Sequence, residues 1–164
     1  MRVFQVLVAR VGNLAARPRR IATLFTRLHA RLLRLSRGRL RRSLFLAGGQ
    51  PVLVLTTRGR KTGQPRSTPV AYFRDGARFV ISAANAGLDR PPAWWLNLQA
   101  DPRADIEVAG RRTSVRARRA EGDEAQRLFE RFVRQNAGAE TTRGFTSREI
   151  PVIVLEPRGH PDRG

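Results

Sequence analysis

The fold of this chain is decided by one stretch, VLVLTTRGRKTGQPRSTPVAYF, which spans residues 52–73. It begins with an apolar run at residues 52–55 and ends with a second apolar run at residues 70–73. Short apolar runs bounded by glycine and proline are typical of buried strands. Between the two runs lies a cationic loop that contains Lys61, the only lysine of the chain. The stretch therefore predicts two strands joined by a basic loop with a glycine near each end.

The loop has the donors that an anion needs. Gly59 and Gly63 allow the backbone to turn and to come close to a ligand. Arginine can hold an oxyanion through two hydrogen bonds, whereas lysine acts as a point charge. The glycines of a P-loop or a Rossmann fingerprint are absent. The loop thus predicts a phosphate-sized site, and the alternative is a solvated basic turn. The residues of this predicted site are Arg60, Lys61, Thr62, Arg66, Ser67 and Thr68.

Charge is distributed unevenly along the 164 residues, a length that favours one domain. The net charge is +19, yet no Asp or Glu precedes Asp75, so residues 1–74 carry a charge of +17. This basicity predicts an anionic partner, which could be a membrane surface, a polyanionic cofactor or a nucleic acid. Nucleic acid is the least favoured, because exposed aromatic residues do not alternate with the arginines. The chain has no cysteine, and neither of its two histidines has a plausible Ser or Asp partner nearby in the sequence. These facts argue against a metal site, including a catalytic one, and against a hydrolytic triad.

Residues 1–48 form a basic, apolar-rich segment. Between Ile21 and Leu35, apolar residues recur at helical spacing among arginines, which predicts a cationic amphipathic helix. No run reaches the length of about 18 apolar residues that a membrane span requires. The helix is expected either to pack on the neighbouring domain or to lie on an anionic membrane surface.

From Gln50 onward, the pattern changes to short strands. About six strands and two small helices are expected before the end of the chain, and this pattern favours a closed or split barrel over a doubly wound fold. The prediction is a mainly β fold with flanking helices, of the split β-barrel, FMN-binding-like type, with an N-terminal amphipathic helical extension. Its parts are residues 1–48 (extension), 49–158 (barrel and cofactor site) and 159–164 (flexible tail).

A second motif lies downstream, where SAANAG at residues 82–87 precedes PPAWWLNLQADP at residues 91–102. Small residues at a strand end let a flat ring approach the backbone, and paired tryptophans could wall such a ring. Core packing is the alternative for Trp94 and Trp95.

Together, the two motifs resemble the deazaflavin-dependent nitroreductase family, the F420-using branch of the split β-barrel flavoproteins. The resemblance extends from about Gly48 to Pro157 and includes a last strand at Ile150–Val154. It implies coenzyme F420 as cofactor, with FMN as the less favoured choice. It also implies that the loop holds the phosphate and the glutamate tail. Residues implied to border the deazaflavin ring are Ser82, Ala83, Ala84, Asn85, Ala93, Trp94, Trp95, Leu96 and Asn97.

The resemblance also implies a reaction, hydride transfer from reduced F420 to an electron-poor acceptor such as a quinone or an enone. No catalytic side chain is expected, because the cofactor carries the chemistry. The acceptor is expected to be hydrophobic. The protein is expected to be cytoplasmic and able to lie on the inner face of the cell membrane. It is also expected to be able to form a homodimer. Residues 84–87 replace the S-K-G-G stretch of well-known members, so nitroimidazole reduction is not carried over. The alternative function is a non-catalytic F420 or flavin carrier on the same barrel.

Overall fold

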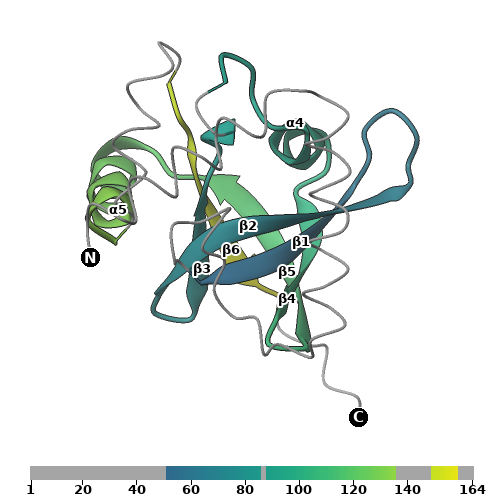
Figure 1. Ribbon diagram of the computed structural model, residues 1–164, viewed down its shortest axis with the longest axis horizontal. Coiled ribbons are helices and arrows are strands. Elements are labelled where there is room, and N and C mark those ends of the chain that lie inside the picture. The colour runs from purple at the N-terminus through teal and green to yellow at the C-terminus, as the bar shows by residue number, and fades with distance from the viewer. Residues whose placement is uncertain (1–50, 86–87, 136–148, 159–164) are drawn as a thin grey trace, which may run out of the picture.

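The computed structural model describes residues 51–85, 88–135 and 149–158, which form a closed antiparallel barrel with two helices (Figure 1). Around the barrel the strands follow the order β1-β2-β3-β6-β5-β4. This architecture confirms the predicted split barrel. The predicted extension, residues 1–48, and the predicted tail, residues 159–164, lie outside the described residues. The elements are β1 (Val52–Arg58), β2 (Pro65–Asp75), β3 (Arg78–Ser82), α4 (Ala93–Ala100), β4 (Arg103–Val108), β5 (Arg111–Arg119), α5 (Gly122–Gln135) and β6 (Val152–Pro157).

Strands β1 and β2 are both longer than the apolar runs that predicted them. The second strand was expected to begin at Pro69, but β2 begins at Pro65, and Pro69 pairs with Val54 inside the ladder. Proline is tolerated in a strand where its missing N–H faces no partner. The pairing of β2 with β3 starts only at Tyr72, so the first half of β2 has β1 as its described neighbour on one side. Strand β1 is paired with β4 from Val54 to Thr57, so it stays in the barrel up to that residue and the hairpin projects at its turn.

The barrel interior is filled by alternate residues of the strands. Leu53, Leu55 and Thr57 of β1 are all inaccessible or nearly so, as expected for one face of a strand with a period of two. The tryptophans of α4 join the same apolar cluster, so this helix closes the barrel beside the base of the hairpin (Figure 1). The members of the cluster are Leu53, Leu55, Phe79, Ile81, Ala83, Trp94, Trp95, Leu98, Ala104, Ile106, Val115, Ala117, Ile153 and Leu155.

Helix α5 covers part of the outer surface of the barrel. Its Leu128 and Phe132 pack on a second cluster that includes Phe73, and the rings of Phe73 and Phe132 lie 6.3 Å apart. Ion pairs surround this contact. Glu124 binds Arg118 at 2.6 Å, and Asp75 accepts from the guanidinium groups of three arginines, Arg78, Arg127 and Arg131.

Candidate functional site

The β1–β2 hairpin ends in a tightly bonded turn, residues 59–64. The N–H of Gly59 donates to the carbonyl of Gln64 at 2.9 Å, and the N–H of Gly63 donates to the carbonyl of Gly59 at 2.7 Å. Gly63 has a φ of 68°, which favours glycine. A Cβ atom on Gly59 would lie 3.1 Å from both the Gln64 carbonyl oxygen and the Thr62 hydroxyl. The two glycines therefore allow a compact turn, and this turn sets the backbone positions of Arg60 and Lys61 between them.

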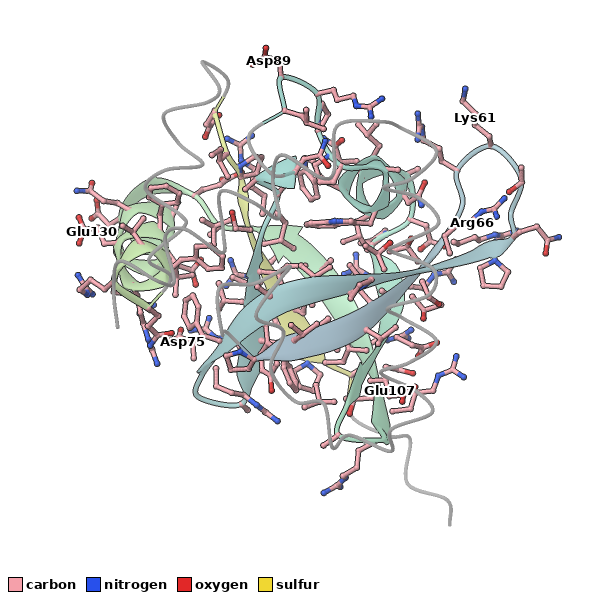
Figure 2. The ribbon with its side chains drawn as sticks, viewed as in Figure 1. Lys61, Arg66, Asp75, Asp89, Glu107 and Glu130 are labelled. Carbon is pink, nitrogen blue, oxygen red and sulfur yellow. The ribbon has the colours of Figure 1, made fainter. Side chains whose placement is uncertain are left out.

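Four cations around this turn have no ion pair with any of the described residues. They are Arg58, Arg60, Lys61 and Arg66, and all four are exposed. Figure 2 shows Lys61 and Arg66 on the hairpin, with Lys61 at its outer end.

The arginines on the α5 side of the barrel differ, because Arg118 binds two carboxylates and Arg127 and Arg131 share Asp75. Positive charge is therefore neutralised around α5 and left unpaired at the hairpin. An arrangement of this kind can attract an anion.

Side chains, more than backbone amides, supply the donors of the hairpin turn. Within residues 59–64, only the N–H of Lys61 has no hydrogen bond to the described part of the chain. The others donate inside the turn, except that of Arg60, which donates to the Asn97 side chain at 3.1 Å. One backbone amide of the turn is therefore available to an anion, beside the cationic side chains.

The hydroxyls of Ser67 and Thr68 lie on opposite faces of the sheet. Ser67 lies on the outer face, where its hydroxyl meets that of Thr56 at 2.9 Å. Arg66 and Thr68, its neighbours in sequence, pair with Thr57 and Leu55, so they share the face that turns toward the barrel interior. Arg66 and Thr68 are thus brought together beside α4, and Ser67 is separated from them by the pleat.

Arg58 is a residue of the hairpin that the sequence reasoning missed. Its Nε and Nη2 atoms would each lie 3.7 Å from a Cβ placed on Gly63, so its guanidinium crosses the turn. The signal was available, because Arg58 directly precedes Gly59 and adds a cation to the same loop.

The end of β3 supplies the small residues. Ala83 is fully buried in the barrel cluster, next to the tryptophans of α4. Ser82 points to the opposite face and is 9% exposed, and its hydroxyl has no hydrogen-bond partner among the described residues. Asn85 has a φ of 49°, and its side-chain amide donates to the carbonyl of Arg90 at 2.8 Å. Asn85 thereby holds the connection that leads to α4, while Ala84 is half-buried beside it.

Helix α4 places its predicted site residues in three different environments. Trp94 and Trp95 are 7% and 8% exposed and belong to the barrel cluster, so most of each ring is packed as core. Ala93 is exposed and Leu96 is half-buried. Asn97 is 5% exposed, and its side-chain amide is engaged with Thr57 and Arg60.

The helix is held at its end by Asp101. Asp101 binds the Arg103 guanidinium through both oxygens, at 2.9 and 3.0 Å. Hydrogen bonds from Arg103 lower the pKa of Asp101 to about 2. The carboxylate therefore stays charged at neutral pH, and β4 begins in a fixed position relative to α4.

No cluster of three or more His, Cys, Asp or Glu side chains occurs in residues 51–85, 88–135 and 149–158. Within those ranges, no helix is long and apolar enough to cross a bilayer.

Comparison with known proteins gives concordant matches. The sequence model of a family described as F420H(2)-dependent quinone reductase matches residues 24–157. The F420H(2)-dependent quinone reductase Rv1261c of Mycobacterium tuberculosis is 36% identical over 143 residues, which cover 85% of this chain and 95% of that protein. A solved structure described as an F420-H2 dependent reductase, FDR-A, is 25% identical with a TM-score of 0.60, over 65% of this chain and 94% of its own. Another, described as a domain-swapped dimer, has the same identity and TM-score over 65% of this chain and 80% of its own.

Proposed function

The chain belongs to the F420H(2)-dependent quinone reductase family, and we propose from this premise that it reduces a quinone at the expense of reduced coenzyme F420. In this reaction F420H2 and a quinone become F420 and a hydroquinone, so two electrons and two protons pass between them. The predicted relationship to the F420-using split-barrel oxidoreductases is confirmed by this membership. The nitroreductase branch that the resemblance names is not shown by these matches, and nitroimidazole reduction is not expected.

The observation that carries the proposal is the unpaired charge of the hairpin. F420 has a phosphate and a tail of glutamates, so its far end is a chain of anions. Arg60 and Lys61 are exposed cations of the turn, Arg66 is exposed at the start of β2, and Arg58 crosses the turn. A charge-assisted hydrogen bond contributes about 1.5–3 kcal/mol. These residues therefore fit the phosphate and the first carboxylates, together with Thr62 and Thr68 as hydroxyl donors. Ser67 supports the hairpin through Thr56.

The ring of the cofactor is proposed to lie against the end of β3. Ala83 and Ala84 bring little bulk to this strand end, and on the opposite face of the strand Ser82 offers a buried hydroxyl that has no partner among the described residues. Trp94 and Trp95 support the helix that closes this end, and the more exposed Ala93 and Leu96 present their surface to the ligand. FMN also carries a phosphate, so the same hairpin admits it, but it has no glutamate tail.

The protein contributes position and electrostatics, and bound F420H2 supplies the hydride from its C5 carbon. The chain needs no nucleophile for this chemistry, and it has no cysteine. Its residues hold the anionic end, leave room for a flat ring beside small side chains, and keep the charge near the hairpin positive. The alternative, a carrier that binds F420 without turnover, uses the same residues.

Membrane association is a further part of the proposal. Quinones are hydrophobic, and residues 1–74 carry a net charge of +17 with no acidic residue. Residues 1–48 are proposed to hold the protein on the anionic inner face of the cell membrane, where such an acceptor would be found. Co-sedimentation with anionic but not with neutral vesicles, lost on deletion of residues 1–48, is the expected result. Equal sedimentation with both kinds of vesicle would contradict it.

A homodimer is also proposed, since one similar solved structure is described as a domain-swapped dimer. Light scattering after size-exclusion chromatography should give twice the chain mass of 18.4 kDa. A mass that stays at one chain across the concentration range would contradict the dimer.

The proposal is tested by a fluorescence titration with oxidised F420, run in parallel with FMN and FAD at physiological salt. Saturable binding of F420 with much weaker binding of the two flavins is expected. Preferential binding of FMN would keep the barrel and change the cofactor. Turnover of F420H2 with a soluble quinone then separates a reductase from a carrier.

A further inference from the structure

One buried side chain connects the two motifs of the site. Asn97 lies on α4, and its Nδ2 donates to the hydroxyl of Thr57 at 3.0 Å while its Oδ1 accepts from the backbone N–H of Arg60 at 3.1 Å. Thr57 is 1% exposed and Asn97 is 5% exposed, so the bond between them is shielded from water, whereas the bond to Arg60 is part-buried. The partners are 40 and 37 residues away in sequence. The helix, strand β1 and the hairpin turn thus meet at this single amide.

The orientation of this amide follows from its partners. A backbone N–H can only donate, so the group that faces Arg60 must be the carbonyl oxygen of Asn97. The NH2 group is then directed to Thr57, whose hydroxyl can accept. Both functions of the amide are used at once. An apolar residue at position 97 would leave the buried hydroxyl of Thr57 and the part-buried N–H of Arg60 without this partner, and a buried polar group without a partner is rare in proteins.

The contact with Arg60 is the one that bears on the cofactor. The other bonded N–H groups of the turn donate within residues 59–64, so they shape the turn but do not attach it to the rest of the protein. The Asn97–Arg60 bond attaches the turn to α4. Because it holds the backbone at Arg60, it also sets the directions in which the side chains of Arg60 and Lys61 start. The strand pairing holds the base of the projecting hairpin up to Arg58 and Pro65 (Figure 1), and the bond from Asn97 adds a contact with the turn itself.

We infer that Asn97 is a positioning residue that fastens the cationic hairpin to helix α4 and so presents Arg60 and Lys61 to the anionic end of the cofactor. This inference rests on the proposed function. It also replaces the expectation that the Asn97 side chain borders the deazaflavin ring, because both ends of its amide are already bonded within the protein. The ring and the phosphate are then recognised by separate parts of the chain.

The separation can be measured with two ligands, F420 and its ring-and-ribityl part, which lacks the phosphate and the tail. For Asn97→Leu, F420 should bind about tenfold more weakly, which corresponds to the loss of one to two net hydrogen bonds. The ring-and-ribityl part should bind as it does to the unaltered protein, within about twofold. Gln99→Leu is the matched control, because Gln99 is an exposed amide on the same helix; it should leave both affinities unchanged.

A second pair of variants keeps the test valid if Asn97→Leu does not fold, as judged by circular dichroism. Thr57→Val removes the hydroxyl that accepts from Asn97, and it should weaken F420 binding in the same selective way, by a smaller factor. Thr57→Ser keeps the hydroxyl and should restore the ratio of the two affinities.

Each other outcome has a definite meaning. An equal loss for both ligands would place Asn97 against the ring and overturn the inference, and so would unchanged binding of both. Failure of the unaltered protein to bind F420 would instead reject the proposed function.

Discussion

Removing the two cations at the tip of the hairpin should weaken F420 binding by about a hundredfold. In the double variant Arg60→Gln/Lys61→Gln, both side chains stay polar but lose their charge and become shorter. Neither cation has an ion pair with the described residues, so the protein loses no internal partner.

The size of the effect follows from the exposure of the two side chains. A charge-assisted hydrogen bond contributes about 1.5–3 kcal/mol, and exposed groups belong at the lower end of that range because water and salt screen them. Two such bonds give about 3 kcal/mol, and each 1.4 kcal/mol is about tenfold in affinity.

The assay is a titration of the deazaflavin fluorescence at several salt concentrations. The unaltered protein should bind F420 more tightly as salt falls, and the double variant should show a smaller dependence. The double variant should also show a smaller difference in affinity between F420 with a long glutamate tail and F420 with a short one. Arg111→Gln/Arg158→Gln is the matched control, because both residues are exposed and have no ion pair with the described residues, and they lie outside the hairpin. Equal losses in the two double variants would refute a local cradle and leave only the effect of net charge.

Three further results are expected. Ser82→Ala should raise the free energy of unfolding without cofactor by about 1 kcal/mol, because it removes a buried hydroxyl that lacks a partner among the described residues, and it should weaken F420 binding; a lower melting temperature would contradict this. Gly63→Ala should lower the free energy of unfolding by about 1 kcal/mol, because the φ of 68° is strained for alanine, and urea titration should detect it; an unchanged urea midpoint would count against a fixed turn. Arg127 lowers the pKa of Asp75 below 3.8, and Arg118 lowers the pKa of Glu124 below 4.5, so the charged carboxylates stabilise the fold above those values and the stability should fall as the pH drops from about 4. The urea midpoints of the unaltered protein and of Glu124→Gln should therefore converge at low pH. Midpoints that differ equally at every pH would contradict the assignment.

Much of the fold could be predicted from the sequence, because its signals are local. The apolar runs at 52–55 and 70–73 and the small helices each mark an element through neighbouring residues. The first half of β2 could not be predicted, because Pro65 and Pro69 argue against a strand. Both prolines fit there because β3 pairs with β2 only from Tyr72 onward, so this part of β2 is bonded to β1 alone among the described strands. The cationic loop was found for the same local reason.

The environments of the site residues could not be predicted in this way. Whether a turn amide is available depends on its bonds, and the Arg60 N–H is occupied by a side chain 37 residues away. The sequence allows Trp94 and Trp95 either to wall a ring or to pack as core, and the packed barrel places them in its interior cluster. Ser67 lies on the outer face of the sheet because of the register between β1 and β2, and the sequence alone does not determine that register.

The central claim is that this chain reduces a quinone with F420H2 held by its hairpin. The most direct measurement is the anaerobic oxidation of F420H2 by a soluble quinone, followed through the return of the deazaflavin absorbance. The unaltered protein should accelerate the reaction many-fold over the uncatalysed rate. Arg60→Gln/Lys61→Gln should need a far higher F420H2 concentration for the same rate. Tight binding of F420 without acceleration by any quinone would contradict the claim and leave a carrier.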